Sequence, residues 1–179
     1  MKQIIMFVKL VFITPLAAQL SIFEDTGKFG CKNSEQKVVI PALYDKIITS
    51  DNFAAIVKQN KWALIERTGK QLSSFINDSI VLFTFAPVAL VKRGAVSDSA
   101  GRKSGGKWGI VDTYGNERIP LKYDEIHPSY FNHDNEKLFI VRVNNQWGAI
   151  NLDGKEVITV NYQQVEECYI NTMSSPEKS

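Results

Sequence analysis

Short apolar runs separated by polar turns follow one another along most of the chain. The clearest runs are residues 53–57, 87–91 and 138–143, which are rich in β-branched and aromatic side chains. Short runs of this kind, bounded by polar residues, are typical of β-strands. After the N-terminal segment, no stretch keeps the 3.6-residue apolar period of a helix. The pattern therefore predicts an all-β domain.

A repeating unit occurs four times along the chain, each time with the same spacing between its signature positions. It has an aromatic and a small residue, a turn seven positions later, and a Tyr-Asp-like pair at plus fifteen and plus sixteen. The four frames lie near 28–47, 61–80, 107–126 and 146–165. Each is expected to form a three-stranded meander, and neighbours must share a core because one meander cannot bury its own apolar face. We predict four meander-type repeats sharing a core, arranged as an open solenoid or a small propeller-like ring.

The recurring residues of the unit have structural explanations. Gly at plus seven supplies the positive φ of a tight turn, so the first copy, with Gln36 there, should need a different turn. Pro lacks an N–H, so the short third strand is expected to end near it. The aromatic rings are expected to pack between copies, with a line of exposed sugar-stacking rings as the alternative, and the Asp to accept N–H bonds in a turn. The signature residues, all given structural roles, are Phe29, Gly30, Pro41, Tyr44, Asp45, Trp62, Gly69, Trp108, Gly109, Gly115, Pro120, Tyr123, Asp124, Trp147, Gly148, Gly154 and Tyr162.

An insertion separates the second copy from the third. It falls in residues 94–106, a Gly/Ser-rich segment that we expect to be an exposed loop. Basic residues around it could attract an anionic partner, whereas the alternative is a solvated loop. Residues 101–107 also match a phosphate-loop pattern, but Trp108 stands where Ser or Thr is needed and a strand should follow, so nucleotide binding is not expected. The candidate interaction loop contains Arg93, Arg102, Lys103 and Lys107.

No residue set demands catalysis. His127 and His133 are the only imidazoles, and although Asp134 and Glu136 are near, the spacing matches no recognised metal site. Neither His has a nucleophile placed beside it by the sequence. The sequence therefore assigns no catalytic, cofactor-binding or metal-ligating residue, and no cofactor.

The composition and the two terminal segments indicate which partners and which cellular location to expect. With 179 residues and a net charge of +2, the chain gives no argument for nucleic acid or an anionic membrane surface. Residues 1–18, with Lys2, an apolar stretch and small residues, look like a signal peptide; an apolar first strand or a retained anchor are the alternatives. We predict a β domain over 19–170, a disordered tail over 171–179, and export to the periplasm, outer surface or extracellular space.

The two cysteines, Cys31 and Cys168, fall in the first and last copies. In an oxidising compartment they could form a disulfide. That requires Cα atoms within about 7 Å, which a ring permits and a long open stack forbids. The alternative is two small buried apolar side chains.

The unit Lys-Trp-Gly-Ile-Val-Asp, with its Gly turn, Ile-Pro and Tyr-Asp-x-Ile at 107–126, resembles the bacterial WG repeat, also called the KWG repeat. The resemblance covers about residues 28–168, and the second copy departs from it at Ala63, Ser74 and Asn77. It implies a β-rich repeat array found in bacterial proteins, many of them exported, with no established enzymatic activity. It supplies no catalytic residue.

Together these observations predict an exported, non-enzymatic WG-repeat binding or interaction module. Its partner would be a protein or a cell-envelope glycan, with no nucleic acid and no stable membrane insertion after signal removal. The alternative function is an inhibitor or immunity-type protein that caps a partner protein. An enzyme with a site in the 94–106 or 127–136 segments is the third hypothesis.

Overall fold

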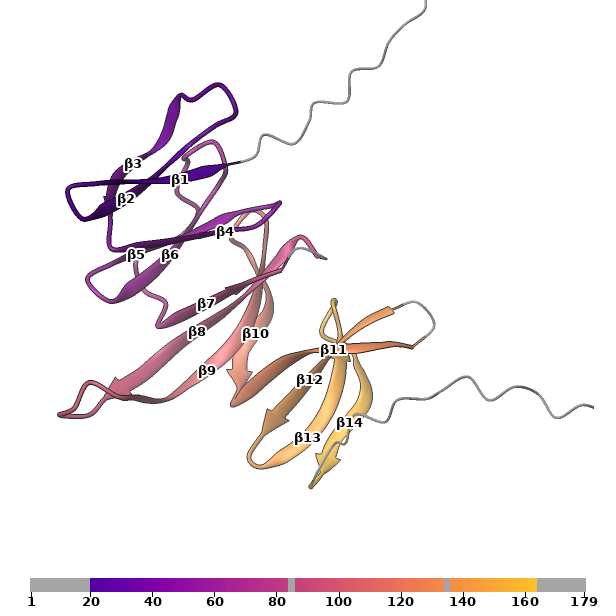
Figure 1. Ribbon diagram of the computed structural model, residues 1–179. Coiled ribbons are helices and arrows are strands. Elements are labelled where there is room, and N and C mark those ends of the chain that lie inside the picture. The colour runs from indigo at the N-terminus through magenta and orange to yellow at the C-terminus, as the bar shows by residue number, and fades with distance from the viewer. Residues whose placement is uncertain (1–19, 84–85, 134–135, 164–179) are drawn as a thin grey trace, which may run out of the picture.

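A computed structural model describes residues 20–83, 86–133 and 136–163 of the chain (Figure 1). In these ranges the chain forms strands and no helix, which confirms the all-β prediction. No segment there is a helix that could cross a membrane. The strands form four small antiparallel sheets that follow one another along the chain, and no sheet closes on itself.

Every sheet is an up-and-down meander in sequence order. Sheet 1 contains β1 (Ser21–Asp25), β2 (Lys28–Lys32) and β3 (Val38–Tyr44), and sheet 2 contains β4 (Lys46–Thr49), β5 (Ala54–Lys58) and β6 (Lys61–Ile65). Sheet 3 contains β7 (Ser79–Leu82), β8 (Val88–Ser97), β9 (Lys103–Asp112) and β10 (Glu117–Tyr123). Sheet 4 contains β11 (Glu125–His133), β12 (Glu136–Val143), β13 (Gln146–Asn151) and β14 (Glu156–Tyr162). The prediction of three-stranded meanders is therefore wrong for sheets 3 and 4.

The additional strand arises because each sequence frame is shared between two sheets. The Tyr of the Tyr-Asp pair ends one sheet, as at Tyr123, and the residue after the Asp begins the next, as at Glu125. Asp45, Asp78 and Asp124 thus stand at the three crossings between sheets. Among the described residues, no copy precedes sheet 1 and no strand pairs with the outer side of β1.

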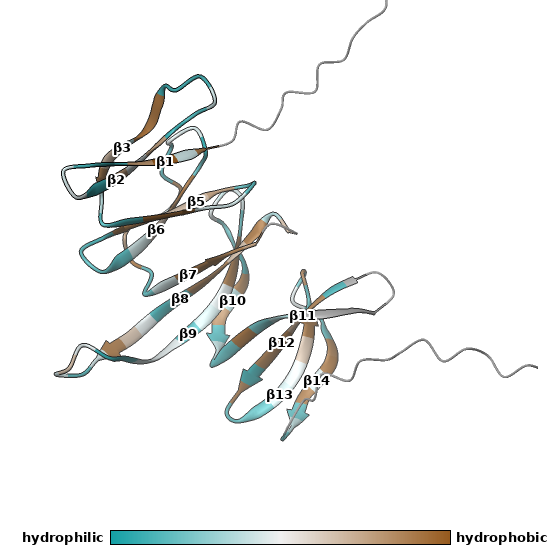
Figure 2. Cartoon of the chain, viewed as in Figure 1, coloured by the Kyte–Doolittle hydropathy of each residue, from teal (hydrophilic) through white to brown (hydrophobic). Residues whose placement is uncertain are grey.

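Three apolar cores hold the stack together, one between each pair of successive sheets. Alternation along the aromatic-containing strand sets the direction of each side chain. In β6, Leu64 packs in the core shared with sheet 3, and Ile65 packs in the core shared with sheet 1. In β9, Ile110 likewise faces sheet 4 and Val111 faces sheet 2. Hydrophobic strand centres and polar turns alternate accordingly down the stack (Figure 2).

The Gly beside the aromatic residue lets two strands of one sheet approach closely. A Cβ on Gly30, Gly109 or Gly148 would lie 2.6 Å from a carbonyl oxygen of the neighbouring strand. Ala63 carries that Cβ in the second copy, and there the last strand is reduced to two isolated bridges, at Gln71 and Asn77. The departure at Ala63 therefore coincides with the replacement of a fourth strand by two isolated bridges in sheet 2.

Two local predictions from the unit are wrong. Pro41 and Pro120 do not end their strands; they lie inside β3 and β10, which are edge strands with register shifts that accommodate the missing N–H. Gln36 also forms the same turn that Gly forms at this position in the other copies. It adopts φ of 63°, and its N–H bonds Asn33 O as the N–H of Gly115 bonds Asp112 O.

The inserted segment 94–106 is a β-hairpin and not the predicted loop. It extends β8 and β9 as a two-stranded ribbon, with Ala95 paired to Gly105 and Ser97 to Lys103. Gly94 and Gly106 oppose each other with positive φ where the ribbon leaves the sheet. The tip is closed by Asp98, whose carboxylate accepts the N–H groups of Ala100 and Arg102.

Candidate functional site

Each crossing between sheets is fastened by the same three hydrogen bonds, made by what we call the hinge aspartate. For Asp124, one carboxylate oxygen accepts from Lys107 Nζ and the other accepts the Asn144 N–H at 2.8 Å. Its own N–H donates to Arg142 O at 2.8 Å. Asp45 repeats these contacts with Lys28, Gln59 and Val57, and Asp78 repeats them with Lys61, Ala95 and Lys92.

These contacts lower the pKa of the hinge aspartates. The Lys28 and Lys107 hydrogen bonds, followed by the turn N–H groups, lower the pKa of Asp45 and Asp124. For Asp78, burial raises the pKa, but the hydrogen bonds from Lys61 and Ala95 outweigh it and the net shift is downward. The hinge carboxylates are therefore charged structural acceptors at neutral pH, and none is a proton donor for chemistry.

The fourth copy lacks this fastening. Gln146 stands where the other copies have Lys, and Gln163 stands seventeen residues later, where they have Asp. The Lys–Asp pairing was missed from the sequence alone. The signal that could have found it is the constant separation of seventeen residues in Lys28–Asp45, Lys61–Asp78 and Lys107–Asp124, with both partners replaced together in the last copy.

The aromatic residue of each unit points toward the following sheet. Phe29 packs against the core between sheets 1 and 2, Trp62 against the next core, and Trp108 against the third. These three rings are half-buried against the cores between sheets, which favours the packing role over the alternative of exposed sugar-stacking rings. Trp147 occupies the same position in sheet 4, where no sheet follows among the described residues.

Sheet 4 consequently presents a surface that no other sheet covers among the described residues, and we call it the end face. Ile158 is 40% exposed, whereas the equivalent Ile119 is 1% exposed. Tyr162 is 53% exposed, whereas the equivalent Tyr123 is 2% exposed. The end face consists of Ile158, Tyr162, Trp147, His127 and Arg142.

A small polar cluster braces Trp147 on this face. The His127 ring stacks on the indole with 6.3 Å between centroids, and the Arg142 guanidinium lies 5.5 Å from the indole centroid. Glu125 joins the two, bonding His127 Nε2 at 3.1 Å and Arg142 Nη2. These two contacts lower the pKa of Glu125, with the His127 hydrogen bond the largest cause. The cluster fixes an aromatic ring without supplying a nucleophile.

The basic residues of the predicted interaction loop are occupied by contacts within the chain. Arg93 Nε donates to Asn77 Oδ1 at 2.8 Å, and Arg102 Nε to Asp98 Oδ2 at 2.7 Å. Lys103 Nζ donates to two carbonyl oxygens, those of Asn60 and Asp78. Lys107 is the hinge lysine of Asp124. These residues brace the ribbon, but the Arg102 side chain is still 82% exposed, so the role of the segment as an interaction loop stays a prediction.

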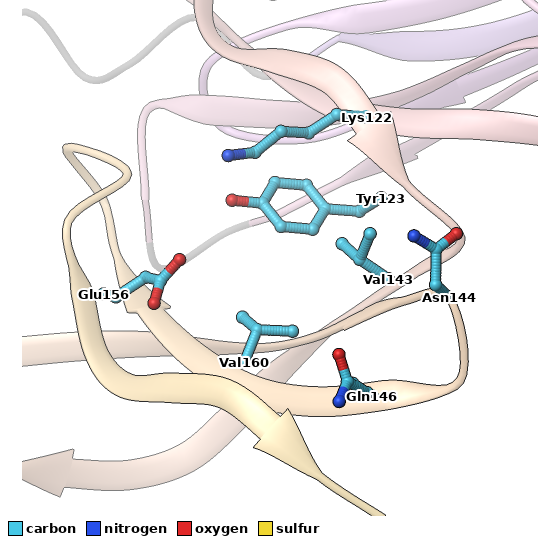
Figure 3. A pocket seen from close by; sticks show the side chains of 7 residues that line it. All are labelled: Lys122, Tyr123, Val143, Asn144, Gln146, Glu156 and Val160. Atoms are coloured by element: carbon cyan, nitrogen blue, oxygen red, sulfur yellow. The ribbon is translucent and has the colours of Figure 1, made fainter.

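A cleft of about 210 Å³ lies between sheets 3 and 4 (Figure 3). The Tyr123 hydroxyl and the Glu156 carboxylate lie on the same side of it, and Lys122 Nζ sits 5.0 Å from the Tyr123 ring centroid. Its volume is below the roughly 300 Å³ at which ligand pockets begin. The cleft is better described as a gap beside the hinge than as a substrate site. Its lining is Lys122, Tyr123, Val143, Asn144, Gln146, Glu156 and Val160.

Several predicted features lie wholly or partly outside the described residues. Cys31 is a free, fully buried thiol in the first core, and burial raises its pKa to about 11. Cys168 lies outside the described residues, so the disulfide stays a prediction, as do the signal peptide 1–18 and the tail 171–179. The side chain of His133 is likewise not described. Among the described residues, no group of three His, Cys, Asp or Glu side chains could hold a metal ion.

Four meanders joined by hinge aspartates and inter-sheet cores define an all-β repeat protein. The model of the WG containing repeat matches residues 29–62, 108–147 and 147–167, more than half of the chain. The chain therefore belongs to the WG repeat family.

Other comparisons add little. No curated protein matches the chain. A solved structure described as a eukaryotic initiation factor aligns over 78% of this chain with 8% identity and a TM-score of 0.37. The chain spans about half of that one, 51% of its length. A likeness this low carries no argument about fold or function.

Proposed function

We propose that this WG-repeat protein is an exported, non-enzymatic interaction module that binds a protein partner through its end face. The observation that carries the proposal is the exposure of Ile158 and Tyr162, whose equivalents Ile119 and Tyr123 in sheet 3 are buried by the next sheet. A surface with the pattern of an inter-sheet core, and no sheet covering it among the described residues, is suited to docking another protein surface.

The composition of the end face favours a protein over a glycan. Sugar stacking needs an open ring face, whereas the Trp147 ring is flanked by His127 and Arg142. Ile158 and Tyr162 add apolar area with the polar cluster at one side, which is the composition of a protein–protein contact. Export is supported by the signal-like residues 1–18.

Photo-crosslinking in the producing cell tests the proposal. Benzoylphenylalanine at Tyr162 should give a discrete adduct after irradiation, because that residue lies on the end face. The matched control replaces Tyr114, which is also exposed but lies in a turn of sheet 3. An adduct at both positions, or at neither, would contradict binding through the end face.

A second variant separates loss of binding from loss of folding. Ile158→Asp should abolish the Tyr162 adduct while leaving the unfolding midpoint nearly unchanged, because Ile158 is already partly in water. The intact mass of the recovered protein tests export: it should lack residues 1–18. A full-length mass would contradict the export part of the proposal.

A further inference from the structure

The two ends of the stack are incomplete in complementary ways. In sheets 2, 3 and 4, the strand after each hinge aspartate pairs with the second strand of the sheet, as β11 pairs with β12. In the part of the chain that the structure describes, sheet 1 has no such strand and no strand pairs with the outer edge of β1. The exposure of β1 shows the consequence. The residues of β1 are almost wholly exposed, whereas Ala54 to Val57 in the equivalent β5 are all buried.

The chain continues beyond sheet 4 in the register of the missing strand. Ile47, Ile80 and Ile126 each lie eighteen residues after the aromatic of their unit and pack in an inter-sheet core. Val165 holds that place after Trp147. The family match also runs on to residue 167. Residues 164–170 therefore have the sequence of a first strand, and no further sheet follows among the described residues.

The turn of the first hairpin also lacks, among the described residues, the contact that a hinge aspartate makes with the equivalent turn of sheet 4. The β1–β2 turn has Thr26 and Gly27 at φ of 49° and 75°, close to the 50° and 62° of Asn144 and Asn145. In the later turn the Asn144 N–H bonds Asp124, whereas among the described residues Thr26 N–H has no acceptor. Gln163, at the hinge position of the last copy, has an amide oxygen that can accept it.

We propose that residues 163–170 of one copy add as a strand to the free edge of β1 in a second copy, seating the end face of the first on sheet 1 of the second. The proposal rests on the end-face function above and names its partner. The register of the other sheets pairs Gln164 with Glu24 and Val165 with Phe23. Phe23 then enters a core, as the equivalent Ile56 does in sheet 2.

A second copy is the occupant because the two ends of one molecule are apart. Sheets 1 and 4 lie at opposite ends of the stack (Figure 1). Strand addition between copies is head to tail, because each copy donates residues 163–170 and accepts the same segment of another copy at β1. Assembly therefore extends beyond a dimer unless the copies close into a ring. At the contact between copies, Gln146 and Gln163 would take the places of the hinge Lys and Asp. This contact would lack the Lys–Asp charges of the crossings within one chain, which suits reversible binding.

The same register separates the cysteines. Cys168 would pair with Leu20, and Cys31 pairs with Ile22, so that β1 lies between the two sulfur-bearing strands. Two strand spacings are about 9.5 Å, beyond the limit of about 7 Å between Cα atoms for a disulfide. Strand addition and a Cys31–Cys168 disulfide are therefore mutually exclusive.

Sedimentation velocity on the chain from residue 19 onward, in reductant and over a wide concentration range, tests the assembly. The intact chain should form oligomers that grow with concentration. Truncation after Gln163 should give monomer only, whereas truncation after Ile170 should assemble like the intact chain. Val165→Asp should also prevent assembly, and the matched Glu166→Asp, on the opposite face of the strand, should not.

Mixing two monomeric variants tests the head-to-tail polarity. Phe23→Asp spoils the accepting end and keeps residues 163–170, whereas the chain truncated after Gln163 keeps an intact β1 edge. Together they should give a dimer and nothing larger. An intact chain that stays monomeric at every concentration, or oligomers that survive both the truncation and Val165→Asp, would overturn the proposal. A Tyr162 adduct whose mass is not a multiple of the chain would overturn self-assembly while the end-face function stands.

Discussion

Sheets 3 and 4 are built from nearly the same sequence unit but have different surroundings. Both have the Trp-Gly pair and the Gly turn, and both contain four strands. In sheet 3 the Ile119 side chain is buried by the next sheet, whereas in sheet 4 the equivalent Ile158 is partly in water. The hinge shows the same change, from Lys107 and Asp124 to Gln146 and Gln163. A repeat residue that stabilises the interior of a stack thus becomes available for binding at its end.

The largest expected difference between the two sheets concerns this isoleucine. Ile119→Ala should lower the free energy of unfolding by about 2–5 kcal/mol, because it leaves a cavity between sheets 3 and 4. Ile158→Ala should cost less than about 1 kcal/mol because its side chain already contacts water. Urea unfolding at low protein concentration measures both. Equal losses would contradict the assignment of the end face as uncovered.

Gly109→Ala and Gly148→Ala sharpen the comparison, since both act within a sheet. The added Cβ would meet the Ile119 or Ile158 carbonyl oxygen at 2.6 Å, and backbone atoms cannot easily move aside. We expect each to cost about 1–3 kcal/mol, with similar values in the two sheets. A large loss at Gly109 and none at Gly148 would mean that sheet 4 does not keep the close strand approach.

The hinge aspartates should differ according to burial. The Asp78 side chain is 2% exposed and that of Asp124 is 30% exposed. Asp78→Asn should therefore cost about 2 kcal/mol, because a buried donor loses its charged acceptor. Asp124→Asn should cost less than about 1 kcal/mol because solvent screens its ion pair. Chemical denaturation at pH 7 compares them, and a larger loss at Asp124 would contradict this ranking.

Acid should remove the hinge contribution in a defined direction. The folded-state pKa values of Asp45, Asp78 and Asp124 are lowered, so their stabilisation is complete above the unfolded value of about 3.9 and is lost as pH falls through the folded pKa. Unfolding midpoints should therefore fall below about pH 4. Asp78→Asn should show a shallower fall than the parent protein, and an identical acid profile would contradict the shift at this residue.

Restoring the missing hinge pair should have the smallest effect. The double variant Gln146→Lys with Gln163→Asp recreates the Lys–Asp pair at the end of sheet 4. In a monomer no following hairpin among the described residues offers an N–H to the new carboxylate, so the gain should be below about 0.5 kcal/mol. Urea unfolding measures it. A gain of about 2 kcal/mol would mean that the ion pair alone, without the turn amide, fastens the crossings.

The fold class and the repeat frames could be predicted because they depend on local pattern. Strand periodicity, turn glycines and Trp-Gly pairs are all readable within short windows of sequence. The sharing of each frame between two sheets could not be predicted in this way, since pairing partners are set by contacts distant in sequence. Only the packing shows that Tyr123 ends one sheet and Glu125 begins the next.

The hairpin at 94–106 was mistaken for a loop because Gly and Ser dominate its composition. The signal that could have corrected this is Asp98 with Gly101, which repeats the spacing of Asp112 with Gly115. In both turns the Asp carboxylate accepts two N–H groups and the Gly has positive φ. The end face was missed for a different reason: Ile158 and Tyr162 carry the same signature as buried residues, and only their position in the stack exposes them.

Hydrogen exchange at four backbone amides tests most directly whether each crossing is fastened by a hinge aspartate and the first sheet is left without one. In the mature chain at low concentration, the amides of Gln59, Ala95 and Asn144 should exchange slowly, because Asp45, Asp78 and Asp124 accept them. Thr26, in the same kind of turn but with no acceptor among the described residues, should exchange fast. Slow exchange at Thr26 in a monomer, or fast exchange at all four amides, would contradict the open start of the stack or the hinge itself.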